Sequence, residues 1–144
     1  MTRKQSPSSV FFNASVLLAG LNSPSGGSAK LLKWINQKKI TGIISEIVLD
    51  EALQHAEKIK HQKKEMQKKI LETFDQVAPP PKLSSVEKFK EVIIDYGDAH
   101  ILASCQEEKA DFLVTLDKKH LLSLSKKIKP FKIVSPKQLI EKLS

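Results

Sequence analysis

Four polar residues stand where buried strands end or helices begin. Asn13 follows the apolar run 10–12, and Asp117 ends a second predicted strand, "DFLVTLD". Asp98 lies at the start of a predicted helix, and Glu51 lies about one turn into another. Carboxylate and amide oxygens suit Mg²⁺ and Mn²⁺, and such ions can activate water against a phosphodiester. If the fold brings these residues together, they form a candidate site for metal-assisted hydrolysis.

Each of the four residues also has an ordinary structural explanation. Asp and Asn often cap helices, and Glu is common on solvated helix faces. Asp98, however, shares one helix face with Ile101, Leu102 and Cys105, so it is expected to point toward the interior. A carboxylate in that position needs a counter-charge or a metal. Taken together at matching strand ends, the four residues favour a metal site over four unrelated caps.

The other residues of catalytic type show no comparable pattern. The histidines have no zinc-type spacing with the single cysteine, so we expect them to lie outside the site: His55, His61, His100 and His120. Cys105 has apolar neighbours on its helix face and is interpreted as a small core residue. Asp95 is interpreted as part of a solvated turn. Neither a P-loop nor a G-x-G-x-x-G stretch is present, so nucleotide binding has no motif support.

Alternating strand and helix patterns predict the elements that would position these residues. Strands are expected at 10–12, 40–45, 111–117 and 131–135. Helices are expected at 16–18, at 28–37 with Ser28 as N-cap, from 46 to about 60, through 66–74, at 86–94, from Asp98, at 118–126 and from Pro136. This order predicts an α/β fold of three layers, α/β/α, with a mostly parallel central sheet. In such sheets the ligand site lies outside the carboxyl ends of the strands.

Composition predicts one soluble globular domain over residues 1–144, with 1–8 as a flexible N-terminus. The 144 residues are 40% hydrophobic and 28% charged, which is ordinary for a folded domain of this size. The apolar runs are shorter than a membrane helix needs, and the start lacks a signal-peptide core, so we expect a cytoplasmic protein without a membrane partner. The net charge of +8 would attract nucleic acid or an acidic protein.

Four blocks of the chain resemble, in order, the conserved blocks of PIN domains: "VFFNASVLLAG", "GIISEIVLDEAL", "DYGDAHILASCQEEKADFLVTLDKKHLL" and "KIVSPKQLIEKL". The resemblance covers nearly the whole chain and is greatest to the stand-alone PIN proteins of prokaryotic toxin–antitoxin systems, including VapC-like ribonucleases. It implies a PIN-like fold and cleavage of single-stranded RNA with Mg²⁺ or Mn²⁺. It also implies a small antitoxin protein that covers the acidic pocket, and a homodimer.

The resemblance assigns roles to particular residues. The family's four acidic positions fall on Asn13, Glu51, Asp98 and Asp117, and two supporting polar positions fall on Ser15 and Thr115. The departure is Asn13, because an amide keeps one oxygen ligand but lacks the negative charge. At ~4 Å and an effective dielectric constant of ~20, one pair of unit charges is worth roughly 4 kcal/mol. The resemblance therefore implies weakened or absent activity, whether Asn13 is a natural residue of a degenerate member or an introduced change.

Two other functions are compatible with the same sequence. A non-catalytic PIN-like module would keep Asn13 and use its basic surface to bind RNA or a protein. A DNA-directed nuclease would use the same acidic residues on another substrate. Lysines in the segment 57–69 would help to guide RNA if the chain is a ribonuclease, or they form an ordinary solvated helix face.

Overall fold

Five parallel strands form the central sheet of the computed structural model, which describes residues 7–58 and 63–144. The strands are β1 (Ser8–Phe12), β2 (Ile40–Ser45), β3 (Gln76–Ala78), β4 (Phe112–Val114) and β5 (Lys132–Val134). They lie in the order β3-β2-β1-β4-β5, and every neighbouring pair is parallel. Strand β1 is central, and the chain continues from it to β2 on one side while β4 lies on the other. This change of direction is where open α/β sheets usually carry a site.

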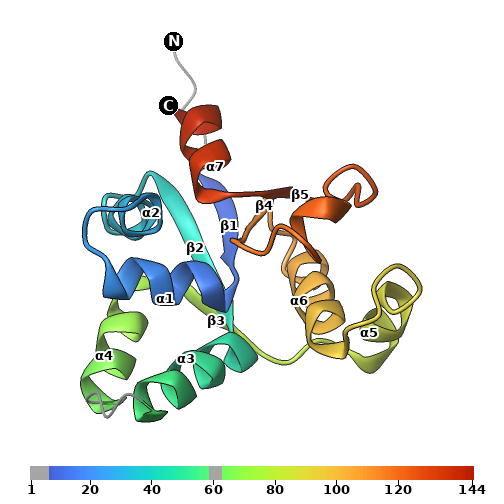
Figure 1. Ribbon diagram of the computed structural model, residues 1–144, viewed down its shortest axis with the longest axis horizontal. Coiled ribbons are helices and arrows are strands. Elements are labelled where there is room, and N and C mark those ends of the chain that lie inside the picture. Colours follow the sequence, from blue (N-terminus) through green and yellow to red (C-terminus); the bar gives the residue numbers. More distant parts are fainter. Residues whose placement is uncertain (1–6, 59–62) are drawn as a thin grey trace.

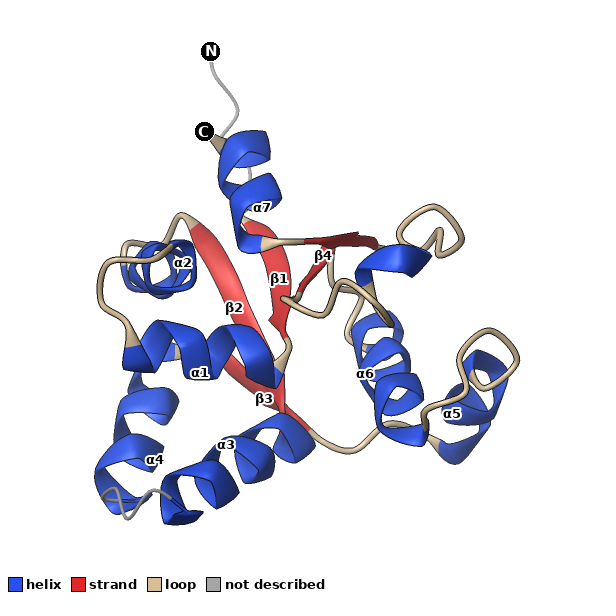
Figure 2. Ribbon diagram, viewed as in Figure 1, coloured by secondary structure: helices blue, strands red, loops and turns tan. Residues whose placement is uncertain are grey.

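Helices cover both faces of the sheet. They are α1 (Ala14–Asn22), α2 (Gly27–Asn36), α3 (Glu46–Lys58), α4 (Lys63–Thr73), α5 (Leu83–Phe89), α6 (Tyr96–Glu107) and α7 (Pro136–Leu143), with a 3₁₀ turn η1 at Leu122–Leu124. In Figure 1, α1, α2 and α4 lie on the left, α3 lies below the strands, and α5 and α6 lie on the right. Figure 2 shows the strands in red between these two groups of helices. The predicted three-layer α/β/α fold with a parallel sheet is confirmed.

The central strand shows why a continuous apolar run predicts a sheet buried on both faces. Val10, Phe11 and Phe12 are each 0% exposed, because helices cover both sides of β1. At Gly42 of β2, an added Cβ would collide with the Ile35 side chain of α2, so glycine permits this helix to lie close to the sheet. Together these contacts fix the strand ends that carry the polar residues.

Several predicted boundaries are wrong. Strand β3 was not predicted, because its three residues precede a run of prolines that ends regular structure. Ser28 does not cap α2: it is buried within the first turn of the helix, and Gly26 occupies the N-cap position. The helix predicted at 86–94 ends at Phe89, and Ile94 is 97% exposed in the loop before α6. The region after β4 contains only η1 and turns instead of a helix over 118–126.

Two predictions concern residues that the structure does not fully describe. The segment 1–8 was predicted to be flexible, but residues 1–6 lie outside the described part of the chain, and β1 begins at Ser8. The lysine-rich segment 57–69 includes residues 59–62, which also lie outside it. Within residues 7–58 and 63–144, no helix is long and apolar enough to cross a membrane. Cys105 is fully buried as predicted, and this burial raises the pKa of its thiol.

Candidate active site

Parallel pairing of β1 and β4 places two of the predicted site positions next to each other, although they lie far apart in the sequence. Phe12 pairs with Val114, so the residues that follow, Asn13 and Thr115, emerge side by side at the same edge of the sheet. The Asn13 peptide N–H donates to the Val114 carbonyl oxygen at 3.1 Å. The sheet itself therefore holds these positions next to each other, although about a hundred residues of chain separate them.

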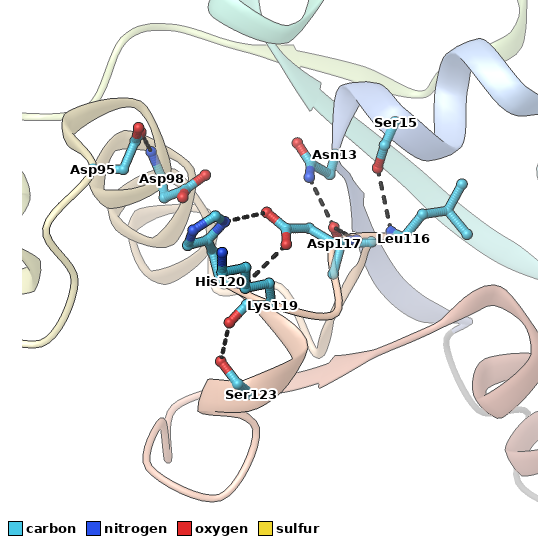
Figure 3. Close-up of polar contacts among 10 residues, drawn as sticks. Asn13, Ser15, Asp95, Asp98, Leu116, Asp117, Lys119, His120 and Ser123 are labelled. Atoms are coloured by element: carbon cyan, nitrogen blue, oxygen red, sulfur yellow. Dashed lines mark hydrogen bonds and ion pairs between the residues drawn. The ribbon is translucent and has the colours of Figure 1, made fainter.

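Both ends of the Asn13 amide make hydrogen bonds. Asn13 is the N-cap of α1, and its Oδ1 accepts from the Ala14 N–H at 2.9 Å. Its Nδ2 donates to Thr115 Oγ1 at 2.8 Å (Figure 3). The Ala14 N–H shows which atom of the Asn13 amide is the oxygen, because only the oxygen can accept a hydrogen bond from this N–H. Asn13 therefore serves as a cap and as a link to the β4 end, and its single oxygen already has one partner.

Thr115 is buried and joins two other residues of the site through hydrogen bonds. The residue is 0% exposed, and its Oγ1 accepts from both Asn13 Nδ2 and the Asp117 N–H, the latter at 3.1 Å. One hydroxyl thus fixes two of the predicted site positions. Ser15 supplies a second tie between α1 and the same loop, because its Oγ accepts from the Leu116 N–H at 3.2 Å. The predicted supporting residues, Ser15 and Thr115, thus lie where they hold the predicted ligands in place.

Asp117 is oriented by the turn that follows it. Its Oδ1 accepts from the His120 N–H at 2.9 Å, and its Oδ2 lies 3.5 Å from His120 Nδ1. Its carbonyl oxygen accepts from the Leu122 N–H at 2.9 Å. Figure 3 shows the Asp117 carboxylate between the His120 ring and the Asn13 amide. The turn therefore holds both the carboxylate and an imidazole at the site.

Asp98 approaches the same point from the first turn of α6. The N-cap of this helix is Asp95, whose Oδ1 accepts from the Asp98 N–H at 2.9 Å. One possible ligand atom each from Asp98, Asp117 and His120 lies within 4.8 Å of the others. Ligand oxygens on opposite sides of a Mg²⁺ ion are about 4.2 Å apart, because each bond is about 2.1 Å long. These residues therefore fit one small divalent ion after slight adjustment.

The carboxylates of this cluster repel one another. Partial burial raises the pKa of Asp98, and the charges of Asp95 and Asp117 raise it further, while His120 acts in the opposite direction. Partial burial also raises the pKa of Glu51, followed by the charges of Asp98 and Asp95. Glu51 lies on α3, so these interactions bring a further element to the site. A divalent cation would relieve this repulsion, which agrees with the predicted metal site.

The structure brings Asp98 and Asp117 together and joins Asn13 to Asp117 through Thr115, whereas Glu51 is linked to them only by charge interactions. It also adds two residues that were not assigned to the site. His120 was expected outside the site, but it lies beside Asp117 because the turn 117–120 folds it back. Asp95 is exposed in the predicted turn, yet it caps α6 and its charge acts on both Asp98 and Glu51. The spacings Asp95-x-x-Asp98 and Asp117-x-x-His120 are the local signals that could have indicated both residues.

Comparisons with known proteins point to one family. The family model for the PIN domain matches residues 9–119. Among curated proteins, none matches the chain. Three similar solved structures support the fold, at 18–20% identity.

VapBC2 from Rickettsia felis, bound to a DNA fragment from its promoter, has 20% identity and a TM-score of 0.67, and the match covers 88% of this chain and 98% of that one. PAE2754 from Pyrobaculum aerophilum has 18% identity and a TM-score of 0.62, with 96% of this chain and 90% of that one covered. A toxin–antitoxin complex from Klebsiella pneumoniae has 18% identity and a TM-score of 0.65, with 86% and 99% covered.

Proposed function

Because the chain belongs to the PIN domain family, we propose that it is a metal-dependent endoribonuclease that hydrolyses phosphodiester bonds in single-stranded RNA, with Mg²⁺ or Mn²⁺. The observation that carries the proposal is the cluster of Asp98, Asp117 and His120 within 4.8 Å, at the carboxyl ends of the central strands. Such carboxylate sites suit hard divalent cations and phosphate substrates.

Each residue of the site would have its own role in binding the ion or in positioning its ligands. Asp98 and Asp117 would hold the ion, and Asn13 Oδ1 and Glu51 would complete its surroundings. The bound ion would supply an activated water and stabilise the leaving oxygen of the phosphodiester. Thr115 keeps Asn13 and Asp117 in register through its two hydrogen bonds. His120, the third member of the cluster, would lie beside the ion, and its peptide N–H holds the Asp117 carboxylate in one orientation.

Asn13 limits the activity that this chain would have. Its amide contributes no negative charge, and its oxygen already accepts from the Ala14 N–H. The ion would therefore bind weakly, and cleavage would be slow or absent. The same residue favours a second candidate, a non-catalytic module that binds RNA or protein at the PIN surface.

The experiment restores the missing charge. An Asn13→Asp variant is expected to cleave single-stranded RNA when Mn²⁺ is added, and Asn13→Asp combined with Asp98→Ala is the matched control. Equal cleavage by both variants would refute the ribonuclease proposal. RNA binding without cleavage would favour the non-catalytic module, and preferential cleavage of a DNA strand of the same sequence would favour a DNA-directed nuclease.

We further propose that the chain is the toxin of a toxin–antitoxin system and acts in the cytoplasm, where its RNA substrate would be. Its partners would be a small antitoxin protein that covers the acidic pocket and a second copy of the chain. The support is that similar structures, from Rickettsia felis and Klebsiella pneumoniae, are VapBC2 and a toxin–antitoxin complex. Size-exclusion chromatography of the purified chain, with light scattering, tests the homodimer.

A further inference from the structure

An open groove of about 800 Å³ adjoins the candidate active site. It runs between the loop after β4, strand β5 and helix α7, and Figure 2 shows α7 following directly from the β5 end. Lys118, the residue next to Asp117, lies at one wall of the groove. A polymer bound at Asp117 could therefore continue into this groove without leaving the protein surface.

Lysines dominate the charge of the groove. Lys118, Lys132 and Lys142 line it from three separate elements, and all three are exposed. Glu141 is the single acidic residue among the described lining residues. The neighbouring site has the opposite charge, because Asp95, Asp98, Asp117 and Glu51 gather there. An RNA strand repelled by these carboxylates would need cationic groups beside the site to hold its phosphates.

The floor of the groove is the free edge of β5. The Lys132 N–H donates to the Asp111 carbonyl oxygen, and the Val134 carbonyl oxygen accepts from the Thr115 N–H, so these groups face β4. Successive residues of a strand direct their peptide groups to opposite sides, so those of Ile133 face the groove. An extended peptide could in principle pair there. A three-residue edge that carries a lysine disfavours such pairing, which makes a phosphate backbone the better occupant.

The lysines of α4 are the competing location for RNA guidance. Lys64, Lys68 and Lys69 are exposed on this helix, within the segment first considered for that role. In Figure 1, α4 lies at the lower left, separated from the β1 and β4 ends by α1 and α3. A strand bound at Asp117 would have to cross these helices to reach it. The groove is the location that adjoins the site.

We propose that this groove holds the phosphate backbone of the RNA strand beside the bond to be cleaved, an inference that rests on the proposed ribonuclease function. Lys118, Lys132 and Lys142 bind successive phosphates on one side of Asp117. Their positive charge anchors RNA without any metal ion, while the acidic cluster requires one. Binding in the groove is therefore separable from catalysis.

The test uses the chain with Asn13 and a fluorescein-labelled 12-mer of oligouridylate, in EDTA, with fluorescence anisotropy at several KCl concentrations. For single strands, each phosphate contact contributes about 0.7 to the slope of log affinity against log salt. The triple variant Lys118→Gln, Lys132→Gln, Lys142→Gln is expected to reduce this slope by about 2 and to weaken binding at least tenfold near 0.1 M salt. Glu141→Gln is expected to tighten binding several-fold.

The matched control removes the same charge from α4 with Lys64→Gln, Lys68→Gln and Lys69→Gln. This control is expected to keep most of the affinity, and an equal loss in both triple variants would overturn the proposal. So would an unchanged slope in the groove variant. A labelled decaglutamate peptide is the second probe, and loss of peptide binding with unchanged RNA binding would assign the groove to an acidic protein segment instead.

These outcomes are distinguishable from failure of the proposed function. If Asn13→Asp does not cleave RNA but the groove variant loses affinity, the nuclease proposal fails and the groove remains an RNA-binding site. If Asn13→Asp cleaves RNA and the groove variant binds normally, only the groove proposal fails.

Discussion

Asn13→Asp should raise the affinity of the protein for a divalent metal ion and lower the stability of the metal-free protein. The substitution adds one negative charge at the point where β1 meets the site, close to Thr115 and Asp117. The new carboxylate can still cap α1, because Asp and Asn are comparable N-caps. The Thr115 hydroxyl can donate to it, so the hydrogen bond that Asn13 Nδ2 makes is replaced rather than lost. The main change is therefore electrostatic.

The expected magnitude follows from Coulomb's law. A carboxylate about 4 Å from a divalent ion gains about 8 kcal/mol at an effective dielectric constant of ~20. Desolvation of the carboxylate offsets part of this gain. If half remains, about 4 kcal/mol corresponds to a roughly thousand-fold lower dissociation constant for Mn²⁺. Without metal, the added charge is expected to lower the free energy of unfolding, because the pKa values of Asp98 and Glu51 are already raised by burial and neighbouring carboxylates.

Isothermal titration with MnCl₂ measures the affinity, and thermal unfolding in EDTA and in excess Mn²⁺ measures the stability. Gln67→Glu is the matched control, because it adds the same charge to the exposed face of α4. Asn13→Asp should have a lower melting temperature than the unchanged chain in EDTA and a higher one in Mn²⁺, whereas Gln67→Glu should show neither effect. A dissociation constant within tenfold of that of the unchanged chain would refute the argument that position 13 faces the ion.

Two further substitutions test the interior of the site. Thr115→Val keeps the shape of a fully buried side chain but leaves Asn13 Nδ2 and the Asp117 N–H without their acceptor, so the free energy of unfolding in urea should fall by about 1–3 kcal/mol. An unchanged free energy of unfolding would contradict the role of Thr115 as the shared acceptor of these two hydrogen bonds. The raised pKa of Asp98 means that the folded state binds its proton more tightly, so metal-free stability should fall as pH rises from about 4 through the raised pKa. Asp98→Asn should remove this part of the decrease and so raise the free energy of unfolding at pH 7, and an identical pH dependence in both chains would rule out that contribution.

Strong local patterns predicted the central features of the fold. The apolar run 10–12 predicted β1, because a strand covered on both faces needs no alternation. Ser45, at the junction of β2 and α3, caps the helix as serine often does, since its Oγ accepts from the Val48 N–H. The short edge strand β3 was not predicted because its three residues carry little periodicity and a run of prolines follows them. The end of α5 was misplaced because Ile93 and Ile94 continue the apolar pattern, although the exposed Ile94 lies in a loop.

The candidate site was predictable only in part. Asn13, Asp98 and Asp117 follow from their places at strand and helix ends, and a parallel sheet brings such ends together. His120 did not follow, because its position depends on how the turn after Asp117 folds back. The engagement of the Asn13 oxygen with the Ala14 N–H was also not visible in the sequence. Three-dimensional geometry decides such details.

The hydrogen bonds that join α1 to the loop after β4 also determine how early the site can form while the chain is being synthesised. Asn13 and Thr115 are 102 positions apart, and Ser15 and Leu116 are 101 apart. At about 5–20 residues per second, the ribosome would need roughly 5 to 20 seconds between making the first partner and making the second. Long-range parallel pairing of this kind also folds slowly. A nascent chain would therefore carry no assembled site until the segment that contains Thr115 and Leu116 had left the ribosome.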